Sequence, residues 1–172
     1  VLGVATTAAL LASGGDDTAG TTATGSPAAT APAERVGNGG QVPDASLAED
    51  RTWTGTISTS QGDIGLELDG AAAPQAVASF VTLAGEGYFD GTDCHRLTTD
   101  GIYVLQCGDP TGTGTGGPGY AFGPIENAPA DDVYPAGTLA MARQGGNGES
   151  MGSQFFLVYE DSTIPADDAG GY

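Results

Sequence analysis

The chain has 172 residues, a formal net charge of −18 and only four cationic side chains, all arginines, against 22 acidic ones. This length leaves room for one modest domain with appended segments. Nucleic acids and anionic membranes bind proteins through basic patches, so the charge balance excludes both as partners.

Residues 1–13 are small and apolar and are typical of the end of an export signal. A lipoprotein signal would carry a cysteine near Ser13 and Gly14, so a lipid anchor is not supported. The run is also shorter than the roughly 20 apolar residues of a membrane-spanning helix. A disordered alanine-rich tail is the alternative. The sequence predicts an exported protein that is extracytoplasmic or attached to the cell envelope.

Residues 14–51 are rich in Gly, Thr, Ala, Pro and Asp and hold almost no large apolar side chains. Such a segment cannot bury enough apolar surface to offset the entropy that it loses on ordering. We therefore expect a disordered linker over 14–51 and a folded domain over 52–172.

The first elements of the domain follow clear periodicities. Apolar residues alternate with polar or small ones over 53–58 and again over 64–68, and a Ser-Gln-Gly-Asp cluster separates the two runs. This pattern predicts a β-hairpin. Pro74 is a favourable first-turn residue, and apolar residues follow it at helical spacing until Gly85 and Gly87. A helix is therefore predicted after the hairpin.

Short apolar segments follow the helix. They predict strands over 94–97, 102–107, 137–142 and 154–158, and a Gly/Thr-rich loop occupies 111–119. Short strands, glycine-rich connections and one clear helix predict a mainly β domain, either a barrel or a sandwich with a helical plug.

The two cysteines, Cys94 and Cys107, lie at the outer ends of two predicted strands. Antiparallel pairing of these strands would bring the two thiols together. Since exported proteins retain disulfides, we expect a Cys94–Cys107 bond. Two buried free thiols are the alternative.

Three motifs lack the context that their usual chemistry needs. Residues 112–117 match the G-x-G-x-x-G spacing of dinucleotide-binding loops, but Pro118 follows them instead of a helix. His95 is the single histidine, which excludes a multi-histidine metal centre, and as a strand neighbour of Cys94 it points to the opposite face. We expect His95 to be a hydrogen-bonded structural residue and Asp109 to be a turn residue rather than an acid catalyst.

Arg96 has a different setting. Neighbouring predicted strands bring aromatic and amide side chains toward it, namely Tyr103, Gln106, Gln154 and Phe156. One permanent cation among rings and amides suits an apolar pocket with a few directed hydrogen bonds. A structural ion pair between Arg96 and one of the many carboxylates is the alternative.

Several ordered motifs extend over residues 53–172: His95-Arg96, the segment Tyr-Val-Leu-Gln-Cys-Gly-Asp-Pro at 103–110, the loop at 112–119, Leu-Ala-Met-Ala at 139–142 and Gly-Ser-Gln-Phe-Phe at 152–156. Together they resemble cyclophilin-type peptidyl-prolyl cis–trans isomerases. Ile164-Pro165 and Tyr172 are similar to the exported actinobacterial branch of that family.

The resemblance implies a closed antiparallel β-barrel with capping helices and a substrate groove on its outer face. It implies proline-containing polypeptides and cyclosporin-like inhibitors as ligands, a monomer, and no cofactor or metal. Two departures stand out. The turn between Arg96 and Tyr103 is longer than in compact members, and the family continues past the position of Tyr172. We therefore expect a barrel that is incomplete at its C-terminus.

The resemblance also assigns roles to individual residues. Arg96 is expected to be the catalytic arginine, assisted by Gln106. Tyr103 stands where phenylalanine is usual in the proline pocket, Arg143 where asparagine is common, and Tyr172 where a groove histidine lies. The remaining expected substrate-binding residues are Val104, Ala142, Gln154, Phe156 and Ile164.

The resemblance implies isomerisation of X–Pro bonds, in which Arg96 hydrogen-bonds the prolyl nitrogen and weakens amide resonance. A non-catalytic proline-peptide binding module or envelope chaperone on the same barrel is the alternative. A purely structural surface protein is a third reading, which rests only on the acidity and the linker.

Overall fold

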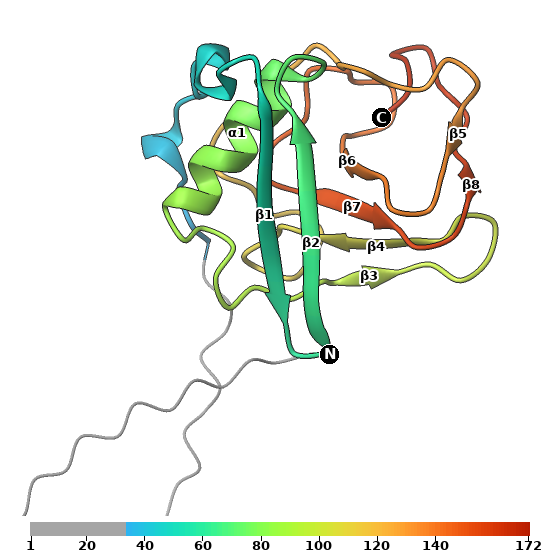
Figure 1. The fold of residues 1–172 in the computed structure, drawn as a ribbon, viewed down its shortest axis with the longest axis horizontal. Helices are drawn as coiled ribbons and strands as arrows, with labels where there is room; N and C mark the ends of the chain where they lie inside the picture. The colour runs from blue at the N-terminus through green and yellow to red at the C-terminus, as the bar shows by residue number, and fades with distance from the viewer. Residues whose placement is uncertain (1–33) are drawn as a thin grey trace, which may run out of the picture.

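The computed structural model describes residues 34–172 and places one α-helix to one side of its strands (Figure 1). Within this range no helix is long and apolar enough to cross a membrane. The expected export signal and the first part of the expected linker lie outside the described residues. The elements are, in chain order, the 3₁₀ helices η1 (Asn38–Gly40) and η2 (Ala45–Ala48), β1 (Thr52–Thr59), β2 (Gly62–Asp69), α1 (Pro74–Gly85), β3 (Arg96–Leu97), β4 (Val104–Cys107), β5 (Val133–Tyr134), β6 (Leu139–Met141), β7 (Phe155–Val158) and β8 (Ser162–Thr163).

The predicted hairpin is confirmed as β1 and β2, which pair antiparallel in the register Ile57 opposite Ile64. Apart from the exposed glycines Gly55 and Gly62, every second residue of each strand is half-buried. Of these, Ile57, Leu66 and Leu68 pack against the core. Period-two alternation therefore gives the hairpin one buried and one solvated face.

The predicted helix is confirmed as α1. Pro74 occupies its first turn, and Val77, Phe80 and Leu83 are buried on one face. The first amides of a helix have no intrahelical acceptor. Here the carboxylate of Glu126 takes those of Gln75 and Ala76, each at 3.0 Å. A distant loop residue thus caps α1.

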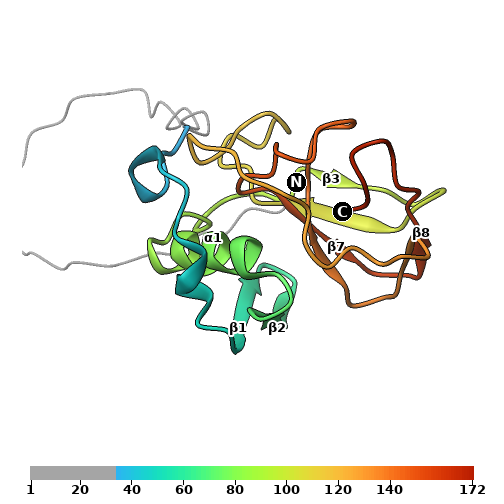
Figure 2. The ribbon, with the colours of Figure 1, turned by 90° about the horizontal axis from the view of Figure 1, so that it is seen from above.

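The central sheet has the strand order β3-β4-β7-β6, and all its pairs are antiparallel. The predicted strands 94–97, 102–107, 137–142 and 154–158 are confirmed with shorter bounds. The two-residue strands β5 and β8, which pair with each other, carry too little periodicity to be predicted. Figure 2 shows α1 and the hairpin on one side of the sheet.

The expected closed barrel is not present in the described residues. A closed barrel needs every edge strand to be hydrogen-bonded to a neighbour. Here the strands form three separate sheets, and β3 and β6 remain the edges of the central one. In addition, residues 34–172 contain one α-helix rather than several capping helices. The mainly β class is confirmed and the closure is wrong.

Side chains of the central sheet pack on both of its faces. On the face toward α1 and the hairpin, Phe80, Cys107, Met141 and Phe155 belong to one buried cluster. The opposite face carries a second cluster, made of Val104, Tyr134, Ala140, Phe156 and Val158. Because successive strand residues alternate in direction, Phe155 and Phe156 anchor opposite clusters.

The linker expected over 14–51 is wrong for its last part. Ala48 is fully buried, and its carbonyl accepts a hydrogen bond from the indole Nε1 of Trp53 at 2.8 Å. The amide of Gly37 donates to the carbonyl of Pro118 at 3.0 Å. Backbone groups and small residues make these contacts. The lack of large apolar side chains therefore did not indicate disorder here. The folded part includes residues 34–51.

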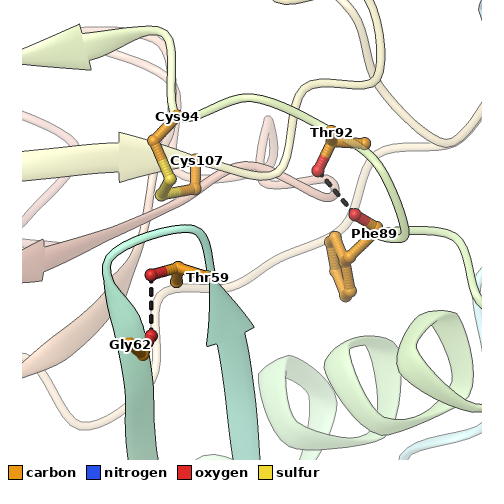
Figure 3. The surroundings of a disulfide bond; sticks show 6 residues. All are labelled: Thr59, Gly62, Phe89, Thr92, Cys94 and Cys107. Atoms are coloured by element: carbon orange, nitrogen blue, oxygen red, sulfur yellow. Dashed lines mark hydrogen bonds between the residues drawn. A yellow bond between two sulfur atoms is a disulfide. The ribbon is translucent and has the colours of Figure 1, made fainter. Parts of the chain in front are cut away.

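The expected disulfide is confirmed: Cys94 and Cys107 are bonded, and it joins the approach to β3 to the end of β4 (Figure 3). The turn of the β1–β2 hairpin lies in its surroundings, where Thr59 Oγ1 donates to the carbonyl of Gly62 at 2.7 Å. The bond closes a 13-residue separation that contains both Arg96 and Gln106. It therefore ties together the two strands that carry these residues.

We expect the double variant Cys94→Ala/Cys107→Ala to unfold with a free energy about 3 kcal/mol lower than the oxidised wild type, because loop closure no longer restricts the unfolded chain. Urea unfolding followed by circular dichroism measures the difference. Wild type treated with dithiothreitol should match the double variant. Equal stability of the oxidised wild type and the variant would contradict the expectation.

Candidate active site

A single row of residues crosses the central sheet. Arg96 on β3 is opposite Gln106 on β4, Gln106 is opposite Phe156 on β7, and Phe156 is opposite Ala140 on β6. Directly opposed residues of antiparallel strands present their side chains on the same face. The register therefore brings the guanidinium, an amide and an aromatic ring together on the face away from α1.

Two side chains of this row, Arg96 and Gln106, form a directed hydrogen-bond chain with Gln154, which precedes β7. Arg96 Nη1 donates to Gln106 Oε1 at 3.1 Å, and Gln106 Nε2 donates to Gln154 Oε1 at 2.8 Å. Gln154 Nε2 in turn donates to the carbonyls of Gly114 and Gly116, at 3.0 and 2.8 Å. The predicted meeting of Arg96, Gln106 and Gln154 is thus present, and a glycine loop ends the chain.

The loop takes its shape from Asp109, which is fully buried. Its carboxylate accepts the amide and hydroxyl of Thr111 and the amides of Thr113, Gly114 and Gly116. Burial on its own would raise the pKa of Asp109, but the hydrogen bonds from Thr111, Gly116 and Gly114 outweigh it and lower the pKa to about 2. Asp109 is a structural residue, as predicted, and it organises the whole loop.

An apolar patch lies beside the hydrogen-bond chain. Phe156 is 6% exposed and its ring meets that of Tyr172 edge to face, with centroids 5.9 Å apart. Val104, at 1% exposed, forms its floor. The partly buried side chains packed against this cluster are Ile102, Ala142, Ile164 and Tyr172. The structure therefore gathers most of the expected substrate-binding residues around Phe156.

Tyr103 is not in this apolar patch. Its ring packs edge to face on Tyr159 with centroids 5.9 Å apart, and Ile102 lies in the cluster instead. Residues two apart on extended chain point the same way, so Ile102 shares the side of Val104. Sequence comparison assigned the pocket to the aromatic residue, whereas period-two alternation back from Val104 would have found Ile102.

Arg143 is expected to bind substrate, but its guanidinium makes its hydrogen bonds to other residues of this chain. Its side chain is fully buried and pairs with both carboxylate oxygens of Asp167, at 3.0 and 2.9 Å. It also donates to the carbonyls of Gly170 and Gly171, and it lies 4.3 Å from the ring centroid of Tyr172. The hydrogen bonds from Arg143 lower the pKa of Asp167 well below its ordinary value. Arg143 thus holds Tyr172 against the patch.

The expectation that His95 is hydrogen-bonded is wrong. Neither of its ring nitrogens has a partner among residues 34–172, and both are buried. The ring is held by packing instead, because it lies against the loop at Gly114. The same described residues contain no group of three or more side chains suited to hold a metal ion.

The hydrogen-bonding end of the site is accessible, because Arg96 is exposed and Gln106 is half-buried, whereas Phe156 and Val104 beside them are buried. A cavity of about 280 Å³ lies between β2, α1 and β6, and another of about 400 Å³ is lined by Arg35, Glu86 and Tyr88. Neither is lined by Arg96 or Gln106. An extended ligand laid over the surface suits this shape better than an enclosed small molecule.

Comparison with known proteins gives one consistent match. The family described as "Cyclophilin type peptidyl-prolyl cis-trans isomerase/CLD" matches residues 54–168. A "Probable peptidyl-prolyl cis-trans isomerase B" of Mycobacterium tuberculosis is 53% identical over 121 residues, which are 64% of this chain and 39% of that protein. The protein of the same name from Mycobacterium leprae is 50% identical over 125 residues, covering 66% of this chain and 42% of that protein.

The chain therefore spans about two fifths of the length of these curated relatives. Among solved structures, a cyclophilin-type peptidyl-prolyl cis–trans isomerase of Cryptosporidium parvum, determined in the presence of the dipeptide Ala-Pro, superposes with a TM-score of 0.52. It is 28% identical, and the match covers 69% of this chain and 90% of that one.

The Asp109 carboxyl should make the stability of the site loop dependent on pH. Its pKa falls from 3.8 to about 2 on folding, so its contribution is present above about pH 4 and is lost as the pH falls toward 2. The shift corresponds to about 2 kcal/mol. Urea unfolding of wild type and Asp109→Asn at several pH values measures it, because the other carboxyls cancel in the difference. The gap should shrink by that amount between pH 5 and 2, and a constant gap would contradict the assignment.

Proposed function

Because the chain belongs to the cyclophilin-type peptidyl-prolyl cis–trans isomerase family, we propose that it catalyses the cis–trans isomerisation of X–Pro bonds in polypeptides. One observation carries the proposal: Arg96 lies in one row with Gln106 and Phe156 on one face of the sheet. Such a row provides a hydrogen-bond donor beside an apolar surface against which a proline ring can pack.

The chemical problem is the partial double-bond character of the amide. Delocalisation of the nitrogen lone pair into the carbonyl creates a barrier of roughly 18–20 kcal/mol to rotation. At the twisted transition state this delocalisation is lost, and the lone pair of the prolyl nitrogen becomes available as an acceptor. A donor at that nitrogen therefore stabilises the transition state more than either ground state. No covalent step is needed.

Arg96 is the donor in this mechanism. Its Nη1 atom is fixed by Gln106 at 3.1 Å, whereas within residues 34–172 its Nε and Nη2 atoms donate to no other residue. The ion pairs of the described residues involve Arg51 and Arg143, which counts against a structural ion pair at Arg96. The free edge of the guanidinium would face the prolyl nitrogen.

The apolar patch holds the proline ring while the preceding carbonyl rotates. Phe156, Val104 and Ile102 form its base, and Tyr172 and Ile164 border it. Gln106 hydrogen-bonds the substrate backbone next to the rotating bond in this account. Because the proline ring is held still, binding energy can favour the twisted transition state over the planar ground states.

The substrates in this proposal are proline-containing segments of exported or envelope proteins. Two observations support it: the Cryptosporidium relative was solved in the presence of Ala-Pro, and the Cys94–Cys107 bond suits an oxidising compartment. Binding of cyclosporin-like inhibitors and a monomeric state stay predictions.

Replacement of Arg96 by alanine should lower kcat/KM for a proline test peptide at least tenfold without unfolding the domain, because the exposed guanidinium contributes to the transition state rather than to the core. Arg96→Lys should also lose most of the activity, since an ammonium lacks the planar fork. Protease-coupled turnover and circular dichroism measure the two properties.

Arg51→Ala is the matched control, because it removes another exposed arginine, one that stacks on Trp53. It should keep wild-type turnover. Undiminished turnover of Arg96→Ala would contradict the mechanism. Peptide binding by wild type without any turnover would instead favour the non-catalytic binding module or chaperone.

A further inference from the structure

We propose that Asp109 is a positioning residue of the site: through the loop of residues 111–116 it orients the amides of Gln154 and Gln106 and so fixes the guanidinium of Arg96. This inference rests on the proposed isomerase function and extends it to a residue that would not touch the substrate.

The Asp109 carboxylate determines the path of the loop. Oδ1 accepts the amide and the hydroxyl of Thr111, both at 2.7 Å. Oδ2 accepts the amides of Thr113, Gly114 and Gly116, at 3.1, 2.6 and 3.1 Å. A fully buried ionised carboxylate is costly unless it is saturated with donors, and here it is. Four backbone amides between residues 111 and 116 therefore point at one carboxylate.

Glycine is required where the loop closes. Gly114 has φ +87°, a conformation that other residues rarely adopt. A Cβ atom at Gly116 would collide with Asp109 Oδ1 and lie 2.9 Å from Thr111 Oγ1. At the next residue, Gly117, a Cβ atom would meet nothing within 4 Å. Two neighbouring glycines thus differ in whether the carboxylate needs them.

The curled loop presents two carbonyls to Gln154. Carbonyl oxygens can only accept hydrogen bonds, so the NH₂ end of Gln154 must face Gly114 and Gly116. The side-chain oxygen of Gln154 then faces Gln106, so Gln106 must donate to it from its own NH₂ group. The orientation of each amide is dictated by its neighbour.

The last step reaches Arg96. Because the NH₂ group of Gln106 donates to Gln154, its oxygen Oε1 faces Arg96 and accepts the hydrogen bond from Nη1. If the loop carbonyls moved away, the Gln154 amide would be free to flip. Gln106 would then be free to present its NH₂ group to Arg96, donor against donor. Arg96 is exposed, so this one acceptor is what holds its guanidinium.

The decisive variant is Asp109→Asn, which keeps the shape of the side chain but removes an acceptor for three loop amides. In protein that circular dichroism shows to be folded, we expect kcat/KM for an Ala-Pro test peptide to fall roughly fivefold, the equivalent of one misdirected hydrogen bond. Gln154→Ala should cause a similar loss.

The two losses should not add, because Asp109 acts through Gln154. In the Gln154→Ala background, Asp109→Asn should change kcat/KM by less than about twofold. A purely structural role of Asp109 would give independent losses that multiply. Multiplying losses, or a folded Asp109→Asn with wild-type kinetics, would overturn the inference.

If Asp109→Asn does not fold, the glycine pair decides the question. Gly116→Ala should lower kcat/KM by a similar factor while Gly117→Ala keeps the wild-type value, and equal kinetics of the two variants would overturn the inference. Failure of the proposed function is recognised separately. Wild-type turnover by Arg96→Ala would contradict the catalytic role of Arg96 and with it the proposed mechanism. An inactive Arg96→Ala together with a fully active Asp109→Asn would contradict only the positioning role of Asp109.

Discussion

The antiparallel pairing of β3 with β4 is the interaction on which the site depends, because it sets Arg96 directly opposite Gln106. β3 has only two residues and one neighbouring strand, so its own strand hydrogen bonds fix its position only weakly. Two features secure it. The disulfide ties the approach to β3 to the end of β4, and the amide of Thr98 donates to the carbonyl of Val104 at 3.0 Å. The proposed catalytic role of Arg96 on such a short edge strand depends on these supports.

The chain uses its few arginines in different ways. Arg35 donates to the carbonyls of Tyr88 and Asp90, and Arg51 pairs with an acidic neighbour and stacks on an indole. Arg143 is buried and saturated by the segment that ends at Tyr172. Among residues 34–172, Arg96 is the one arginine that donates to a side-chain amide, and neither it nor Arg35 has a carboxylate partner. A neutral partner leaves the charge uncompensated by a carboxylate, and therefore available to a ligand.

Much of the fold could be predicted from periodicity. The alternation around Ile57 and the helical spacing after Pro74 depend on local patterns, which the tertiary structure follows. The ordered segment at 34–51 could not be predicted, because backbone groups of Gly37 and Ala48 make its contacts. Barrel closure was inferred from resemblance alone, and hydrogen bonds between distant strand edges leave no local signal.

For the site, the resemblance pointed to Arg96, Gln106 and Phe156, and the strand register brings these three residues into one row. The resemblance did not anticipate the partners of Arg143 within this chain. Arg143 was taken for a substrate contact, yet its partner Asp167 lies 24 residues away, at a distance that no local pattern covers. The role of Asp109 was hidden for a similar reason, since its donors are backbone amides, which are the same in every sequence.

The central claim is that this face of the sheet lowers the barrier to X–Pro rotation and does not merely bind proline. Two-dimensional exchange NMR on a peptide with a single Ala-Pro bond tests it most directly, because free peptide interconverts only over about tens to hundreds of seconds. With substoichiometric protein the account predicts exchange cross-peaks between cis and trans resonances at sub-second mixing times. Resonances that shift on binding while no cross-peaks appear would contradict it.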